Sequence, residues 1–104
     1  MIRVIVERKQ ELIKKLTITG HANAAPHGED LVCAGVSAIG VGLLNALDLL
    51  AKDSCHMIMS EGDIRIDVVT ANDTNQMILN VGIIQLESIE EVYKKFIRIK
   101  KQEV

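Results

Sequence analysis

Residues 31–52 constrain the fold of this chain more than any other segment, because this helix-length run is apolar on nearly every face. Asp30, just before it, is a residue type that caps helix N-termini, so the pattern predicts one long helix beginning at residue 31. A helix that is apolar all round must be buried on all sides, and 104 residues offer little material to cover it. Glycines at 35, 40 and 42 would permit close approach by another helix. We therefore expect part of this helix to contact a second copy of the chain in a homodimer.

The flanking segments show the period-two alternation of strands. Ile2, Val4 and Val6 alternate with charged residues, and the pattern resumes over residues 12–20, which predicts a first hairpin. Residues 56–60 and 64–69 lie on either side of a Glu-Gly-Asp turn and predict a second hairpin. Residues 21–29, which contain one proline and one glycine, read as a loop.

A second helix follows. Asp73 with Gln76 resembles a capping box, and Ser88 with Glu91 resembles another, so the pattern allows this helix to break and restart. Residues 96–100 fit either a short fifth strand or a last helical turn. The expected fold class is α+β in a single domain over residues 1–104. Two β-hairpins, with or without a fifth strand, form a sheet packed against the long apolar helix and a C-terminal helix.

Composition excludes several classes of function. Tyr93 and Phe96 are the only aromatic residues and the net charge is −2, which argues against nucleic-acid binding. Two cysteines do not make a disulfide framework, and charged residues stand where a signal peptide needs an apolar stretch. The apolar run at residues 31–44 contains Ser37 and three glycines, and by this reading falls short of a membrane span. We expect a soluble cytoplasmic protein with neither nucleic acid nor membrane as a partner.

Candidate chemistry is concentrated between Gly20 and Ser37. Cys33 lies in the first turn of the expected helix, where free backbone N–H groups and the helix dipole favour a thiolate. His21, at the end of a strand, is suited to take and return the proton. Gly20 and Gly28 flank the loop between them and are its expected hinges.

Each of these residues also has a structural interpretation. Cys33 would serve equally as a small buried apolar residue, and His21 as a loop histidine bonded to backbone. His27 is a second candidate base, closer in sequence to the cysteine. Asp30 either caps the helix or orients the imidazole as a third catalytic member, and we favour the cap. Ser37, one turn beyond Cys33, either contacts the histidine or substrate or bonds back to the helix.

Metal and redox interpretations are weaker. The histidines and cysteines lack the spacings typical of metal sites, and no phosphate-binding loop is present, so we expect neither a metal nor another cofactor. Cys55 follows the expected helix and is interpreted as a packing residue. A thiol redox sensor that uses Cys33 with Cys55 remains an alternative.

The motifs Gly20-His21-Ala22 and Gly28 through Ser37 resemble those of the ribosomal-processing cysteine protease family of Firmicutes and related bacteria. The likeness extends over the whole chain. If the segment from Gly20 to Cys33 is merely a folded loop, the alternative is a non-enzymatic binding module associated with the ribosome. Many members of that family carry an aromatic residue in the loop, where this chain has Ala24-Ala25.

The resemblance implies a cysteine endopeptidase that removes a short N-terminal extension from the twenty-seventh protein of the large ribosomal subunit. Cleavage would follow an aromatic residue, and the enzyme would be a homodimer. By the resemblance, His21 and Cys33 match the catalytic pair, Asp30 and Ser37 match supporting positions, and an acyl-enzyme is the expected intermediate. The N–H groups of the first helical turn are expected to form the oxyanion hole.

Overall fold

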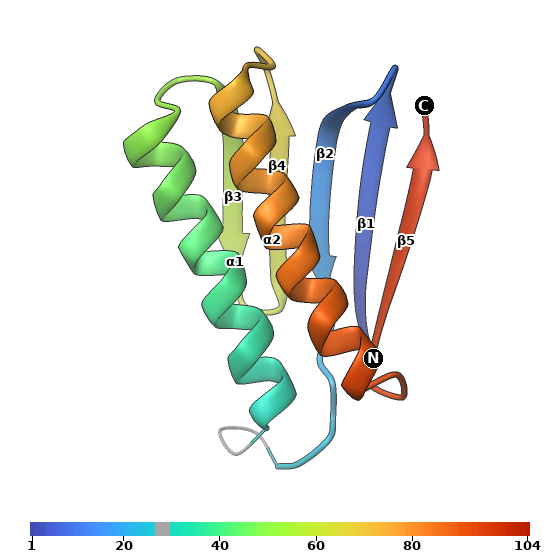
Figure 1. The fold of residues 1–104 in the computed structure, drawn as a ribbon. Helices are drawn as coiled ribbons and strands as arrows, with labels where there is room; N and C mark the ends of the chain where they lie inside the picture. The colour runs from blue at the N-terminus through green and yellow to red at the C-terminus, as the bar shows by residue number, and fades with distance from the viewer. Residues whose placement is uncertain (27–29) are drawn as a thin grey trace.

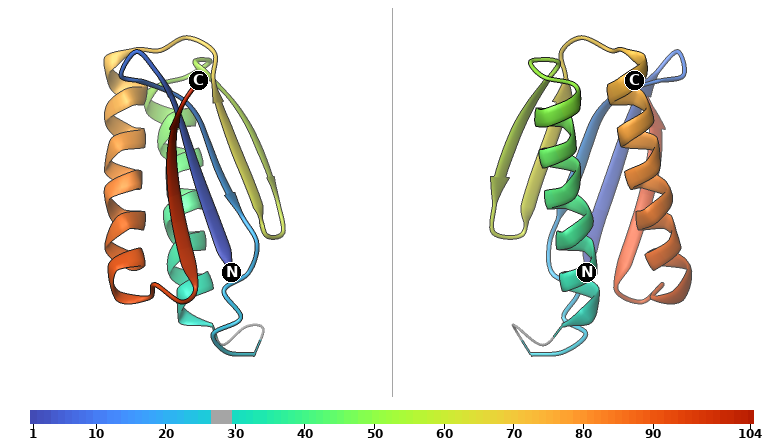
Figure 2. Two further views of the ribbon diagram at one scale, coloured as in Figure 1. Left: turned by 90° about the vertical axis from the view of Figure 1, so that its right-hand side faces the viewer. Right: turned by 60° about the vertical axis from the view of Figure 1, so that its left-hand side comes forward.

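The computed structural model describes residues 1–26 and 30–104, which form one five-stranded sheet with two helices on one of its faces (Figures 1 and 2). The order along the chain is β1 (Ile2–Lys9), β2 (Leu12–Thr19), α1 (Leu31–Leu50), β3 (Cys55–Ser60), β4 (Asp63–Val68), α2 (Asp73–Val92) and β5 (Ile97–Glu103). The strand order across the sheet is β3-β4-β2-β1-β5. The expected α+β fold is confirmed.

Both expected hairpins are present. β1 pairs antiparallel with β2, and β3 pairs antiparallel with β4. β4 also pairs antiparallel with β2, which joins the two hairpins in one sheet. Residues 97–103 form the fifth strand, which pairs parallel with β1. The alternative of a last helical turn is therefore wrong, because residues 97–103 extend the sheet beyond β1.

The core lies between the helices and the sheet. β1 contributes Ile2, Val4 and Val6, and β4 contributes Ile64 and Ile66, all of which are buried as the period-two pattern predicts. Both helices pack on this aliphatic layer.

α1 is buried along one stripe rather than all round. Val32, Val36, Gly40, Leu43 and Leu47 form this stripe. A Cβ on Gly40 would lie 2.5 Å from Ile64 Cδ1, so this glycine lets the helix backbone approach the sheet closely. The helix ends at residue 50, two residues earlier than expected.

Two expectations about α2 are wrong. Its capping box is formed by Asn72 and Asn75, not by Asp73 and Gln76. The Gln76 amide instead contacts β2, because its Oε1 accepts from the Ile13 N–H at 2.7 Å and its Nε2 donates to the Ile13 carbonyl at 2.9 Å.

The helix also continues without a break to residue 92. Ser88 lies inside it and donates from Oγ to the Ile84 carbonyl one turn earlier, so its hydroxyl does not cap a new helix.

α1 is long and apolar enough to cross a membrane, judged by length and composition alone. The expectation that this segment falls short of a span is therefore wrong, both for its length and for its composition. A helix from the core of a soluble protein passes the same test, so the finding is weak evidence for a membrane span. Of the most apolar 18-residue stretch of α1, 28% is buried within this chain.

Candidate active site

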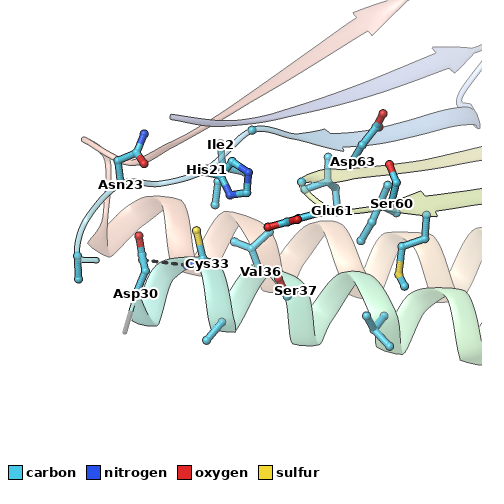
Figure 3. Close-up of a pocket in the computed structure, with 18 residues that line it drawn as sticks. Ile2, His21, Asn23, Asp30, Cys33, Val36, Ser37, Ser60, Glu61 and Asp63 are labelled. Atoms are coloured by element: carbon cyan, nitrogen blue, oxygen red, sulfur yellow. Dashed lines mark hydrogen bonds between the residues drawn. The ribbon is translucent and has the colours of Figure 1, made fainter. Parts of the chain in front are cut away.

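A cavity of about 680 Å³ opens at the end of the molecule where β2 ends, α1 begins and the β3–β4 turn lies (Figure 3). His21 comes from the segment after β2, Cys33 and Ser37 come from α1, and Glu61 comes from the turn. Apolar side chains from β1, β2, β4 and α1 supply much of the remaining wall. The fold therefore brings the expected histidine and cysteine into one cavity.

Cys33 is half-buried in the first turn of α1. Its Sγ accepts a hydrogen bond from the Ala22 backbone N–H at 3.2 Å. The side chain points from the helix towards the segment that carries His21 (Figure 3).

His21 directly follows Gly20, whose φ of +94° is accessible to few residues other than glycine. The imidazole lies against the β3–β4 turn, with its Nε2–Cε1 edge towards Gly62. Within residues 1–26 and 30–104, no hydrogen bond joins this ring to Cys33 Sγ. Catalytic hydrogen bonds are often long or unformed without substrate, so the arrangement is compatible with a base that approaches the thiol during reaction.

Asp30 is the N-cap of α1, as the sequence predicts. Its Oδ1 accepts from the N–H groups of Val32 and Cys33, both at 3.0 Å, and its Oδ2 accepts from the Ala24 N–H at 2.8 Å. These bonds, with that from Cys33 foremost, hold the pKa of the Asp30 carboxyl below its ordinary value, although burial opposes them. No bond between this carboxylate and His21 is present among the described residues. The geometry is that of a cap.

The depressed pKa of Asp30 predicts acid sensitivity that depends on this carboxylate. Its stabilisation is complete above the pKa of the unfolded chain, about 3.9, and is lost as the pH falls through the lower folded value. We therefore expect the melting temperature of Asp30→Asn, which keeps a capping oxygen, to fall less steeply than that of the wild type below about pH 4. Thermal melts between pH 7 and pH 2 measure this. If the melting temperatures of the two proteins fell in parallel with pH, the charge on Asp30 would not stabilise the folded state and the prediction would be wrong.

Other predicted residues fall in different places. Ser37 lines the cavity one turn beyond Cys33. Gly28 and His27 lie outside the described residues. Cys55 begins the edge strand β3, where burial raises the pKa of its thiol against an opposing contact with Ser54.

No group of three metal-ligating side chains occurs in residues 1–26 and 30–104.

The β3–β4 turn is the part of the site that sequence reasoning missed. Glu61 and Gly62 line the cavity, and Figure 3 shows the Glu61 side chain reaching into it. The Glu-Gly-Asp triplet marks a turn but carries no sign that it meets a histidine from a distant segment. The contact depends on the pairing of β4 with β2, which local pattern does not specify.

Sequence comparison decides the family. The family model for cysteine protease Prp matches residues 1–98. The chain belongs to the cysteine protease Prp family. A Prp named ribosomal processing cysteine protease in Bacillus subtilis strain 168 is 35% identical, over 95% of this chain and 96% of the relative. A Prp of the same name in Staphylococcus aureus strain Mu50 is 34% identical, over 84% of this chain and 85% of the relative.

Solved Prp structures have the same fold. A crystal structure of S. aureus Prp with a covalently linked product peptide superposes with a TM-score of 0.92 at 33% identity, covering 98% of this chain and all of that one. A second S. aureus Prp structure, with a substrate peptide, gives 0.86 at 32% identity over the same shares. The chain is therefore a cysteine protease, and the alternative of a non-enzymatic binding module is set aside.

Proposed function

We propose that this Prp removes the N-terminal extension from the twenty-seventh protein of the large ribosomal subunit, with His21 and Cys33 as its catalytic pair. The observation that carries the proposal is the position of Cys33, at the capped start of α1 in the same cavity as His21. The ribosomal-processing activity named for the B. subtilis and S. aureus relatives supports the substrate class. A cytoplasmic location follows from that substrate.

The mechanism requires one base and one nucleophile. His21 takes the proton from Cys33 as the ring moves towards sulfur, and the thiolate attacks the scissile carbonyl to form a tetrahedral intermediate. That intermediate collapses to a thioester when His21 returns the proton to the leaving amine. Water activated by the same imidazole then hydrolyses the thioester and regenerates the thiol.

The proposed oxyanion donor is the Ala22 N–H rather than the first-turn N–H groups expected from sequence. In this structure the N–H groups of Val32 and Cys33 donate to Asp30 Oδ1, and that of Ala34 donates to the Asp30 carbonyl. These first-turn groups are engaged by the cap. The Ala22 N–H donates to Sγ itself at 3.2 Å, so it lies beside the atom to which the acyl group becomes attached, and this position supports it as the donor.

The residues that line the cavity favour a peptide with an apolar residue before the scissile bond. Ile2, Ile18, Val36, Met59 and Ile64 are among its apolar lining residues. An aromatic side chain of the substrate would bury its ring against these groups. The described charged side chains of the lining are all acidic, which disfavours an acidic peptide.

Mass spectrometry of the candidate ribosomal protein, incubated with wild-type or Cys33→Ala enzyme, tests the proposed substrate. We expect the wild type alone to release the N-terminal extension, with one cut after an aromatic residue. Release by neither enzyme, while the wild type still cleaves another peptide, would refute the substrate and leave the protease assignment intact.

The exposed face of α1 supports a homodimer. Leu31, Leu49 and Leu50 are 79%, 78% and 69% exposed, and Val41 lies between them along the helix. Covering these side chains would remove apolar surface from water, at about 25 cal/mol per Å². A second copy presenting the same face would cover Leu31, Leu49 and Leu50 symmetrically.

Sedimentation equilibrium at micromolar concentration measures the oligomeric state. We expect about 23 kDa, twice the 11.5 kDa of the chain. The variant Leu49→Lys should shift the equilibrium towards monomer, whereas Asp48→Asn, which also raises the net charge by one at the neighbouring exposed position, serves as the charge-matched control. A single 11.5 kDa species for the wild type would contradict the dimer.

A further inference from the structure

Gly62 leaves room for the imidazole of His21. A Cβ built on this glycine would lie 2.8 Å from His21 Nε2 and 3.2 Å from Cε1. Contacts below 3.0 Å are essentially never made by a Cβ, so any side chain here must displace the ring. Gly62 has a φ of +68°, which residues other than glycine rarely adopt.

The same turn is bonded to the residue before the histidine. The Gly20 N–H donates to the Gly62 carbonyl at 2.9 Å. This bond continues the pairing of β2 with β4 beyond the Thr19–Asp63 pair, so the turn is fixed to the sheet on the side of the histidine. The backbone before His21 and the ring of His21 therefore both lie against Gly62 in the β3–β4 turn.

We propose that Gly62 is a positioning residue for the catalytic histidine: its missing side chain and its carbonyl set where the imidazole lies relative to Cys33. The inference rests on the proposed role of His21 as base. It assigns to the β3–β4 turn a function in the reaction, since this turn sets the position from which the ring approaches the thiol, and a small misplacement of a catalytic group is costly.

The first test compares Gly62→Asn and Gly62→Ala with the wild type. Asparagine tolerates positive φ better than other side chains, so Gly62→Asn keeps the turn while still placing a Cβ against the ring. We expect kcat to fall about 100-fold with KM nearly unchanged, as for a misplaced catalytic group. Gly42→Ala, where a Cβ would meet no atom within 4 Å, is the control and should keep wild-type kinetics.

The second test separates positioning from general damage. If Gly62 acts through His21, then adding Gly62→Asn to His21→Ala should cause no further loss of activity. The pH profile of Cys33 alkylation by iodoacetamide gives the same comparison without substrate, and Gly62→Asn should reproduce the profile of His21→Ala. This readout decides the proposal even if the wild type cleaves none of the peptides offered, an outcome that would count against the proposed function alone.

A measurement on the wild type needs no variant to fold. We expect a nuclear Overhauser effect between the His21 ring proton on Cε1 and the Gly62 α-protons. Its absence would overturn the proposal, as would wild-type kcat in both Gly62 variants or an equal fold-loss from Gly62→Asn with and without His21.

Discussion

Cys33→Ala is expected to abolish peptide cleavage, with kcat lowered by about 10⁴-fold or more, as for loss of the nucleophile in other proteases. The Ala22 N–H would then face a methyl group, and the sulfur that forms the acyl bond would be gone. The fold should be retained, because the side chain is half-buried and the capping bonds to Asp30 come from backbone N–H groups. Cleavage of a peptide that spans the processing site, followed by mass spectrometry, measures the loss.

Cys55→Ala is the matched control, since it removes the other thiol of the chain. Burial raises the pKa of Cys55, so this thiol is mostly protonated at neutral pH and should contribute nothing to turnover. Wild-type kinetics in Cys55→Ala are expected. Retained activity in Cys33→Ala together with loss in Cys55→Ala would reverse the assignment of the nucleophile.

His21→Ala is expected to lower kcat by about 10²- to 10⁴-fold, the range for loss of a general acid–base group. The effect is smaller than that of losing the nucleophile because a free thiol is already a few per cent thiolate at pH 7. Steady-state kinetics with a peptide that spans the processing site measure the loss.

Two further histidine variants complete that test. His56→Ala removes an exposed imidazole on β3 that does not line the cavity, so its kinetics should match the wild type. His27→Ala examines the second candidate base. Wild-type turnover in His21→Ala combined with loss in His27→Ala would contradict the proposed pair.

The elements of this fold are visible in the sequence because each has a local cause. The alternation of Ile2, Val4 and Val6 specifies a half-buried strand, and Asp30 specifies a helix start that the structure confirms. The β1–β2 turn was only weakly signalled, since Gln10 and Glu11 both take positive φ without glycine or asparagine.

Features set by distant contacts could not be read in this way. Gln76 resembles a cap partner in sequence, but its side-chain amide is hydrogen-bonded to the backbone of Ile13, which lies on β2. The cysteine and histidine were found from residue type and position. The Ala22 N–H and the Gly62 turn were not, because backbone groups of the site depend on strand pairing and carry no side-chain signature.

The most direct test of Cys33 as the nucleophile is to locate the acyl-enzyme. Wild-type protein is mixed with substrate, quenched in acid within one turnover and digested under mildly acidic conditions with trypsin, which separates Cys33 from Cys55 by cutting after Lys52. We expect the mass of the released extension, less one water, on the fragment that contains Cys33. Substrate cleavage with that fragment unmodified at every time point, or with the added mass on the fragment that contains Cys55, would contradict the proposed mechanism.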